Sequence, residues 1–286
     1  MWYLITILSG FSFATADTFS KKESKNMSTI HLSWVREAYA LPFLLVMLFF
    51  IDIPKIDAIF WWAILVCIVM DLFTTILYMK AIKIAPLSLA IPYMGLTPLF
   101  SLLISYLILG ETTSLSGFVG ILLISFGAYI LQIDRAKFGI MEPILAILRN
   151  KGSRYMLIVS FAYAITANIG KVAIIHSSPL FMCIVYFTGL ALAFTPLVMT
   201  IGKTTPGMMF SNYKGKLKIG LAMAIMAITH FSAISMINVA YMISIKRFSL
   251  LFAILYGWLF FGEKNIKERM VGGIIIIAGA ALIAFA

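Results

Sequence analysis

Apolar stretches of about 20 residues, separated by short polar segments, recur along the whole chain. Because about 20 helical residues cross the hydrocarbon core of a bilayer, each stretch predicts a membrane-spanning helix. The pattern predicts ten spans, at residues 2–20, 30–50, 59–80, 86–108, 114–133, 154–175, 179–201, 218–237, 241–261 and 267–286. The longest polar stretch, 132–154, predicts a linker near the middle of the chain, with a short interfacial helix near 143–149.

The two halves of the chain carry similar sequences. "FSFATADTFSKK" from Phe11 matches "FAYAITANIGKV" from Phe161 at a spacing of 150 residues. "LGETTSLSGFVGILLISFGAYI" matches "FGEKNIKERMVGGIIIIAGAAL" at a spacing of 152 residues. Several matches in one order and nearly one register indicate duplication. The halves are residues 1–135 and 154–286, joined by a basic linker at 136–153.

Each half contains five predicted spans, an odd number, so the second half enters the membrane from the opposite side. The sequence therefore predicts an all-α, polytopic membrane protein with ten transmembrane helices, arranged as two inverted five-helix repeats. Inverted repeats are common in secondary transporters, whose substrate site lies near the middle of the membrane between the halves.

The composition supports a membrane protein, because 62% of the 286 residues are hydrophobic and only 12% are charged. No basic region precedes the first apolar stretch, which predicts a retained helix rather than a cleaved signal. Cys67 and Cys183 both lie within apolar stretches, which favours packing over a disulfide or a metal site. The sequence contains no nucleotide-binding glycine loop and no catalytic motif, so we expect neither an enzyme nor a cofactor.

A Gly-Glu pair follows the fourth span of each half, and the fifth span carries spaced glycines. These residues are Gly110, Glu111, Gly120 and Gly127 in the first half, and Gly262, Glu263, Gly272 and Gly279 in the second. With five plus five spans, the chain resembles the EamA family of the drug/metabolite transporter superfamily over about residues 3–132 and 155–285. The resemblance implies a ten-helix transporter, without a cofactor, for small metabolites, amino acids or related compounds. The glycines indicate close helix packing, within one protomer or between the two copies of a homodimer.

Basic residues are distributed unevenly between the two sets of loops. The net charge is +11, and 17 of the 22 Lys and Arg residues lie in the odd-numbered loops. Because cytoplasmic loops carry an excess of Lys and Arg, we expect these loops in the cytoplasm and both termini outside. The resemblance to the family implies cytoplasmic termini instead. The same charge could attract nucleic acid, but loop charge is the better interpretation in a membrane chain, so no nucleic-acid partner is expected.

Charged side chains within a span usually face the interior of the helix bundle or a water-filled cavity. Asp71 lies within the third span, and Thr74, Thr75 and Tyr78 follow on the same helical face. We predict that Asp71 and Tyr78 line a substrate cavity. The alternative is that the threonines bond to their own helix and the polar stripe only joins helices.

Arg36 and Glu37 are neighbours in the second span and point about 100° apart, so only one of them need face the cavity. The alternative is that both side chains extend to the membrane interface. Arg36 aligns with Tyr186 of the second half, which joins the predicted substrate-binding set. Asp17 and Lys21 lie one helical turn apart, a spacing that favours a local ion pair.

His230 aligns with Tyr78 at a spacing of 152 residues. A single buried histidine can be a packing residue, but this position in the repeat also makes it a candidate ligand or proton carrier. Lys171 is the counterpart of Lys21 and is either an interface anchor or a cation in the cavity.

Lys246 and Arg247 lie side by side in the otherwise apolar "ISIKRFSLLF". They align with Met94 and Gly95, inside a fourth span rich in proline, so we place them in the upper part of the ninth helix. In family-like geometry the fourth and ninth helices line the central cavity. We therefore predict that Lys246, Arg247 and Tyr93 of the fourth span bind substrate, with interface anchoring as the alternative for the two cations.

These residues favour a secondary-active transporter of the cytoplasmic membrane that works by alternating access. The predicted substrate is a small polar or amphipathic metabolite, such as an amino acid, an organic anion or a phosphorylated compound. Glu37, Asp71 and His230 can change protonation, which predicts coupling to protons. The alternatives are a flippase for a lipid-linked head group, and a membrane-embedded receptor or enzyme.

Overall fold

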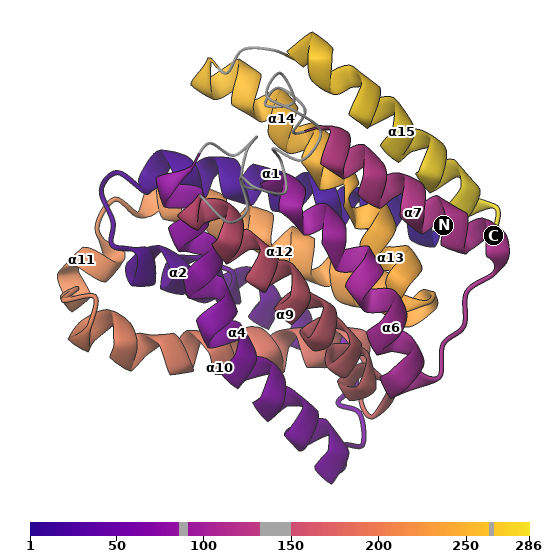
Figure 1. Ribbon diagram of the computed structural model, residues 1–286. Coiled ribbons are helices and arrows are strands. Elements are labelled where there is room, and N and C mark those ends of the chain that lie inside the picture. Colours follow the sequence, from indigo (N-terminus) through magenta and orange to yellow (C-terminus); the bar gives the residue numbers. More distant parts are fainter. Residues whose placement is uncertain (86–90, 132–149, 263–265) are drawn as a thin grey trace.

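The computed structural model describes residues 1–85, 91–131, 150–262 and 266–286, and every described element is helical (Figure 1). The first half contains α1 (Trp2–Glu23), α2 (Thr29–Ala38), α3 (Leu41–Val46), η1 (Met47–Phe50), α4 (Ala58–Ile84), η2 (Ile91–Leu96), α6 (Thr97–Leu109) and α7 (Leu115–Ile130). The second half contains α9 (Lys151–Ile175), α10 (Pro179–Thr200), α11 (Pro206–Phe210), α12 (Tyr213–Met236), α13 (Val239–Lys246), α14 (Phe248–Phe261) and α15 (Ile266–Ala284). Over the described residues, each predicted span coincides with one helix or with consecutive helices.

The helices have the length and the surface of a membrane-embedded bundle. Six segments are long and apolar enough to cross a membrane: Thr29–Phe50, Ala58–Ile84, Lys151–Ile175, Pro179–Thr200, Tyr213–Met236 and Val239–Phe261. Shorter apolar helices cover Tyr93–Leu109, Leu115–Ile130 and Val271–Ala284. Large apolar side chains point outward, including Phe49 and Phe73, which are 88% and 70% exposed. Such a surface suits contact with lipid. The interfacial helix expected near 143–149, most of the linker and Glu263 lie outside the described residues.

Helices of the two halves pack against each other in matched pairs. α4 packs along α9, and α1 packs along α12, which is the same contact with the halves exchanged. In the same way, α6 contacts α9, and α14 contacts α1. α7 and α15, the last helices of the two halves, pack on each other and lie side by side in Figure 1. The interface between the halves therefore forms the centre of the bundle.

Four glycines explain how closely α7 and α15 approach each other. A Cβ atom placed at Gly120 would lie 2.7 Å from the carbonyl oxygen of Gly279, and one at Gly127 would lie 2.7 Å from that of Gly272. Cβ atoms do not pack this closely against backbone oxygens, so only glycine permits this contact between backbones. The glycines join the two halves within one chain, which removes them as an indication of a homodimer.

The ninth span is interrupted at the cations that the sequence placed inside an unbroken helix. Arg247 is the single residue between α13 and α14, and its backbone N–H donates to the Ser244 carbonyl at 3.0 Å. The Arg247 carbonyl accepts from the Leu250 N–H at 2.9 Å. These short-range bonds satisfy the backbone at the break, as a membrane interior requires.

The fourth span departs from regular α-helix at the corresponding position. Its 3-10 helix η2 is followed by the α-helix α6, which begins at Thr97 with Pro98 in its first turn. At the repeat spacing of 152 residues, Arg247 corresponds to Gly95 in η2, two residues before α6 begins. Both halves therefore depart from regular α-helix at nearly the same position.

Candidate functional site

A cavity of about 120 Å³ lies between the halves, lined by α1, α2, α4, η2, α9, α10, α12 and the α13–α14 break. Seven of the predicted site residues line it: Arg36, Glu37, Asp71, Tyr186, His230, Lys246 and Arg247. They come from both halves and are distant in sequence, so the fold alone brings them together. Tyr78 and Tyr93 are buried but are not among the described residues that line the cavity.

One part of the wall is cationic, and we call Lys246 and Arg247 the cationic pair. Their residues are only 8% and 4% exposed, and both line the cavity. Lys246 Nζ lies 3.1 Å from Nδ1 of His230 and 5.1 Å from the centre of the Phe13 ring. Arg247 Nε donates to the carbonyl of Ile243 at 3.2 Å. Neither cation forms an ion pair with any residue that the structure describes. An interface anchor would extend toward the membrane surface, whereas these side chains are enclosed.

Another part of the wall is acidic, and we call Asp71 of α4 and Glu37 of α2 the acidic pair. Both side chains line the cavity, with the residues 3% and 4% exposed. The Tyr186 hydroxyl donates to Oδ2 of Asp71 at 2.5 Å. Asp71 Oδ1 and Glu37 Oε2 have no hydrogen-bond partner in the described part of the protein. A buried carboxylate oxygen without a partner is costly, so this region of the cavity is suited to a donor or a cation.

Arg36 forms a buried ion pair that the sequence did not predict. Its Nη1 donates to Asp17 Oδ1 at 2.8 Å and to Ser20 Oγ at 3.2 Å. The Tyr78 hydroxyl donates to the other Asp17 oxygen at 2.5 Å. The expected local pair between Asp17 and Lys21 is wrong, because a tertiary partner on α2 takes the carboxylate.

The polar stripe on α4 divides between two environments. Asp71 and Thr75 line the cavity, whereas Tyr78 faces Asp17. Thr74 Oγ1 donates to the Met70 carbonyl of its own helix at 2.9 Å, as the alternative interpretation of the stripe expected. Only the first turn of the stripe therefore belongs to the cavity.

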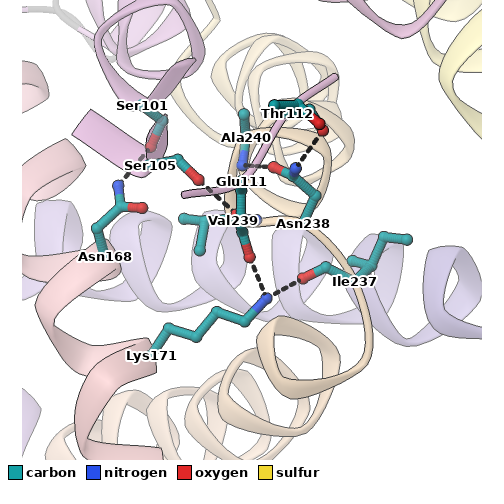
Figure 2. Close-up of polar contacts among 10 residues, drawn as sticks. All are labelled: Ser101, Ser105, Glu111, Thr112, Asn168, Lys171, Ile237, Asn238, Val239 and Ala240. Atoms are coloured by element: carbon teal, nitrogen blue, oxygen red, sulfur yellow. Dashed lines mark hydrogen bonds and ion pairs between the residues drawn. The ribbon is translucent and has the colours of Figure 1, made fainter. Parts of the chain in front are cut away.

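A second polar cluster, which the sequence did not predict as a unit, joins α6, α9 and the α12–α13 turn (Figure 2). Lys171 of α9 donates to Glu111 Oε1 at 2.5 Å and to the Ile237 carbonyl at 2.7 Å. Glu111 Oε2 accepts from the backbone N–H of Val239 at 2.9 Å and from the hydroxyl of Ser105. Lys171 is thus neither an interface anchor nor a cavity cation. We call this arrangement the Glu111 cluster.

The Glu111 cluster lies beside the cavity wall, because Gly170, the neighbour of Lys171, lines the cavity. Asn238 strengthens the same junction by donating to the Thr112 carbonyl at 3.1 Å. The Gly-Glu pair that marks the repeat was the available sequence signal for this cluster. Its partners could not be identified, because they lie 60 and 128 residues away from Glu111.

The described residues offer no evident metal site. Within those ranges, no group of three or more His, Cys, Asp or Glu side chains is placed to hold a metal ion. Cys67 and Cys183 are buried free thiols. Cys67 Sγ contacts the Thr166 carbonyl at 3.6 Å, as expected of a packed cysteine.

Comparison with known proteins identifies the family. No curated protein matches this chain. A solved structure titled as the crystal structure of a protein aligns with a TM-score of 0.72 over 98% of this chain and 95% of that chain. At 14% sequence identity, this likeness shows the fold alone. The sequence model of the EamA-like transporter family matches residues 1–133 and 150–285, nearly the whole chain. The helices that can cross a membrane and the cavity between the halves agree with this match. The chain belongs to the EamA-like transporter family.

Proposed function

We propose that this chain is a secondary-active transporter with ten membrane helices in two inverted repeats, residues 1–135 and 154–286. It moves a small polar or amphipathic metabolite with an anionic group across the cytoplasmic membrane by alternating access. The metabolite is released chemically unchanged. Family membership supports transport, and the chemistry of the cavity supports the anionic group.

The observation that carries this proposal is the departure from regular α-helix at matching positions of the fourth and ninth spans, a 3-10 helix that leads into α6 and a turn at Arg247. Interrupted helices in corresponding positions of two repeats are typical of substrate sites in secondary transporters. The cationic pair lies at Arg247 and the residue before it and lines the cavity, where neither cation forms an ion pair with a described carboxylate. Buried cations that form no ion pair within the protein favour binding of a carboxylate or phosphate group of the substrate.

Coupling to protons is the second component of the proposal. Glu37, Asp71 and His230 all line the cavity, so a substrate in the cavity can reach groups that exchange protons. If one of these side chains gains or loses a proton as the substrate binds or leaves, substrate transport is linked to a pH gradient.

The test uses the purified protein in proteoliposomes and a panel of labelled amino acids, dicarboxylates and phosphorylated compounds. We expect saturable uptake of at least one compound that carries an anionic group, and a response of that uptake to an imposed pH gradient. Removal of both cations in the Lys246→Gln, Arg247→Gln variant should raise the half-saturation constant about tenfold or more, because charge-assisted contacts are lost.

A matched control separates the site from the net charge of the protein. Lys214→Gln, Lys218→Gln also removes two positive charges, but from exposed positions at the start of α12. This variant should keep the wild-type constant. The proposal fails if no panel compound is transported, or if both double variants transport with unchanged constants at equal abundance. Uptake that is indifferent to the pH gradient removes the coupling alone.

A further inference from the structure

The cavity wall carries acidic and basic side chains that form no ion pair with any residue the structure describes. The cationic pair comes from the α13–α14 break, and the acidic pair comes from α2 and α4. Among the described residues, no ion pair joins these four side chains to each other or to any other group. The third cation of the wall, Arg36, is already held by Asp17.

The acidic pair has acceptor atoms to spare. Tyr186 binds one oxygen of Asp71, which leaves Oδ1 without a partner in the described protein, and Glu37 Oε2 is in the same situation. Both residues are more than nine-tenths buried and both line the cavity. Buried carboxylate oxygens require a hydrogen-bond donor, and a molecule bound in the cavity can supply it.

A substrate with a single charge would satisfy only one part of this wall. A simple anion would bind the cationic pair and leave two buried carboxylates uncompensated. A simple amine would bind the acidic pair and leave two buried cations uncompensated. In either case the unpaired groups would oppose binding, because charges in a water-poor site need a counter-charge. A molecule that carries both charges satisfies both pairs.

We propose, building on the transport function above, that the substrate is a small zwitterion, with its anionic group at Lys246 and Arg247 and its ammonium group at Asp71 and Glu37. The cavity volume of about 120 Å³ limits the enclosed part of the ligand to about ten heavy atoms. The anionic group is a phosphate or a carboxylate, which share the same charge-assisted chemistry.

The test measures binding to the purified protein with two sets of matched probes. The phosphate set is phosphoethanolamine, ethyl phosphate and ethylamine, and the carboxylate set is β-alanine, propionate and ethylamine. Dissociation constants follow from the dependence of the thermal unfolding midpoint on probe concentration, because a ligand that binds the folded state raises that midpoint. In the wild-type protein, at least one of the zwitterions should bind about tenfold more tightly than the matched anion and the matched amine of its set, or more tightly still.

Two variants assign the charges to their positions. In Asp71→Asn, Glu37→Gln, the zwitterion should bind no more tightly than the matched anion, whose affinity should be retained. In Lys246→Gln, Arg247→Gln, both the zwitterion and the anion should lose about tenfold or more in affinity. The three-probe comparison on the wild-type protein needs no variant, so it decides the outcome even if the acidic-pair variant does not fold.

Two results overturn the zwitterion and leave the proposed transporter of anions intact. One is wild-type protein that binds the anions as tightly as the zwitterions, as protonated carboxylates would allow. The other is an acidic-pair variant that keeps the full preference for a zwitterion. A different result, in which no probe binds or binding is indifferent to the cationic pair, overturns the zwitterion and the proposed anionic site together.

Discussion

The buried ion pair between Asp17 and Arg36 predicts a large loss of stability for Asp17→Asn. The two side chains are 1% and 3% exposed, and their charged atoms lie 2.8 Å apart. The substitution keeps the shape of the side chain but leaves the guanidinium buried without its counter-charge, and Tyr78 loses a charged acceptor. Removing one partner of a buried pair costs about 3–5 kcal/mol, so we expect a loss of that size.

The assay is a double-mutant cycle on unfolding in mixed micelles, followed by tryptophan fluorescence as the fraction of denaturing detergent rises. Arg36→Gln alone should also cost about 3–5 kcal/mol, because Asp17 is then the unpaired charge. The double variant should cost less than the two losses added together, with a coupling energy of about 2 kcal/mol or more. A second cycle that combines Asp17→Asn with Lys21→Gln should give a smaller coupling energy.

Two results would show that this reasoning is wrong. Losses that add within about 0.5 kcal/mol would mean that Asp17 and Arg36 do not interact. A larger coupling energy with Lys21 than with Arg36 would restore the local pair that the sequence favoured. In either case the arrangement of α1 against α2 would need revision, because that contact brings the two charges together.

Three other changes test separate parts of the fold. Glu111→Gln removes the charged acceptor of Lys171 and should lower the unfolding free energy by about 1.5–3 kcal/mol in the same titration; an unchanged value would mean that the cluster does not stabilise the fold. Gly279→Ala places a Cβ 2.6 Å from a carbonyl oxygen of α7 and should cost about 1–3 kcal/mol, whereas Gly207→Ala meets no atom within 4 Å and should cost much less. The pKa of Asp57 is lowered by the backbone N–H groups at the start of α4 and by its histidine partner. Its stabilising effect is therefore present above the unfolded pKa of about 4, and Asp57→Asn should lower the unfolding midpoint at pH ~7 but hardly at pH ~2.5, where an unchanged deficit would contradict the shift.

The apolar pattern was sufficient to find the helices but not their interruptions. Length and hydrophobicity decide whether a segment can cross a membrane, and both are local properties of the sequence. The break at Arg247 has no such signal, because neither proline nor glycine occurs in "SIKRFS". Proline does lie at the start of α3, as Pro42, and at the start of α6, as Pro98, as expected of a residue that suits the first helical turn.

Seven of the nine predicted site residues line the cavity, but the sequence did not predict which charged residues pair with each other. A charge within an apolar span is visible in sequence, and its cost in lipid explains why it turns inward. The partner of each charge depends on which helices meet. Asp17 therefore joins Arg36 across 19 residues and Tyr78 across 61 residues, at distances along the chain that no local spacing rule covers.

The duplication separates structural polar residues from functional ones. Lys21 donates to the Ala85 carbonyl and Lys171 to the Ile237 carbonyl, both at 2.7 Å, and the four residues correspond at the repeat spacings. A contact that both halves keep belongs to the fold, since both halves need it to hold the end of a helix.

The groups of the cavity wall show the opposite behaviour. At the repeat spacings, Asp71 corresponds to Met223, and Lys246 corresponds to Met94. All four of these residues line the cavity, so the two halves present different chemistry at equivalent positions around one space. In a duplicated fold, each position of the cavity wall has an equivalent position in the other half. Where only one of the two positions is charged, the two sides of the cavity differ in charge. A substrate with two different ends fits such a cavity better than a substrate with two equal ends.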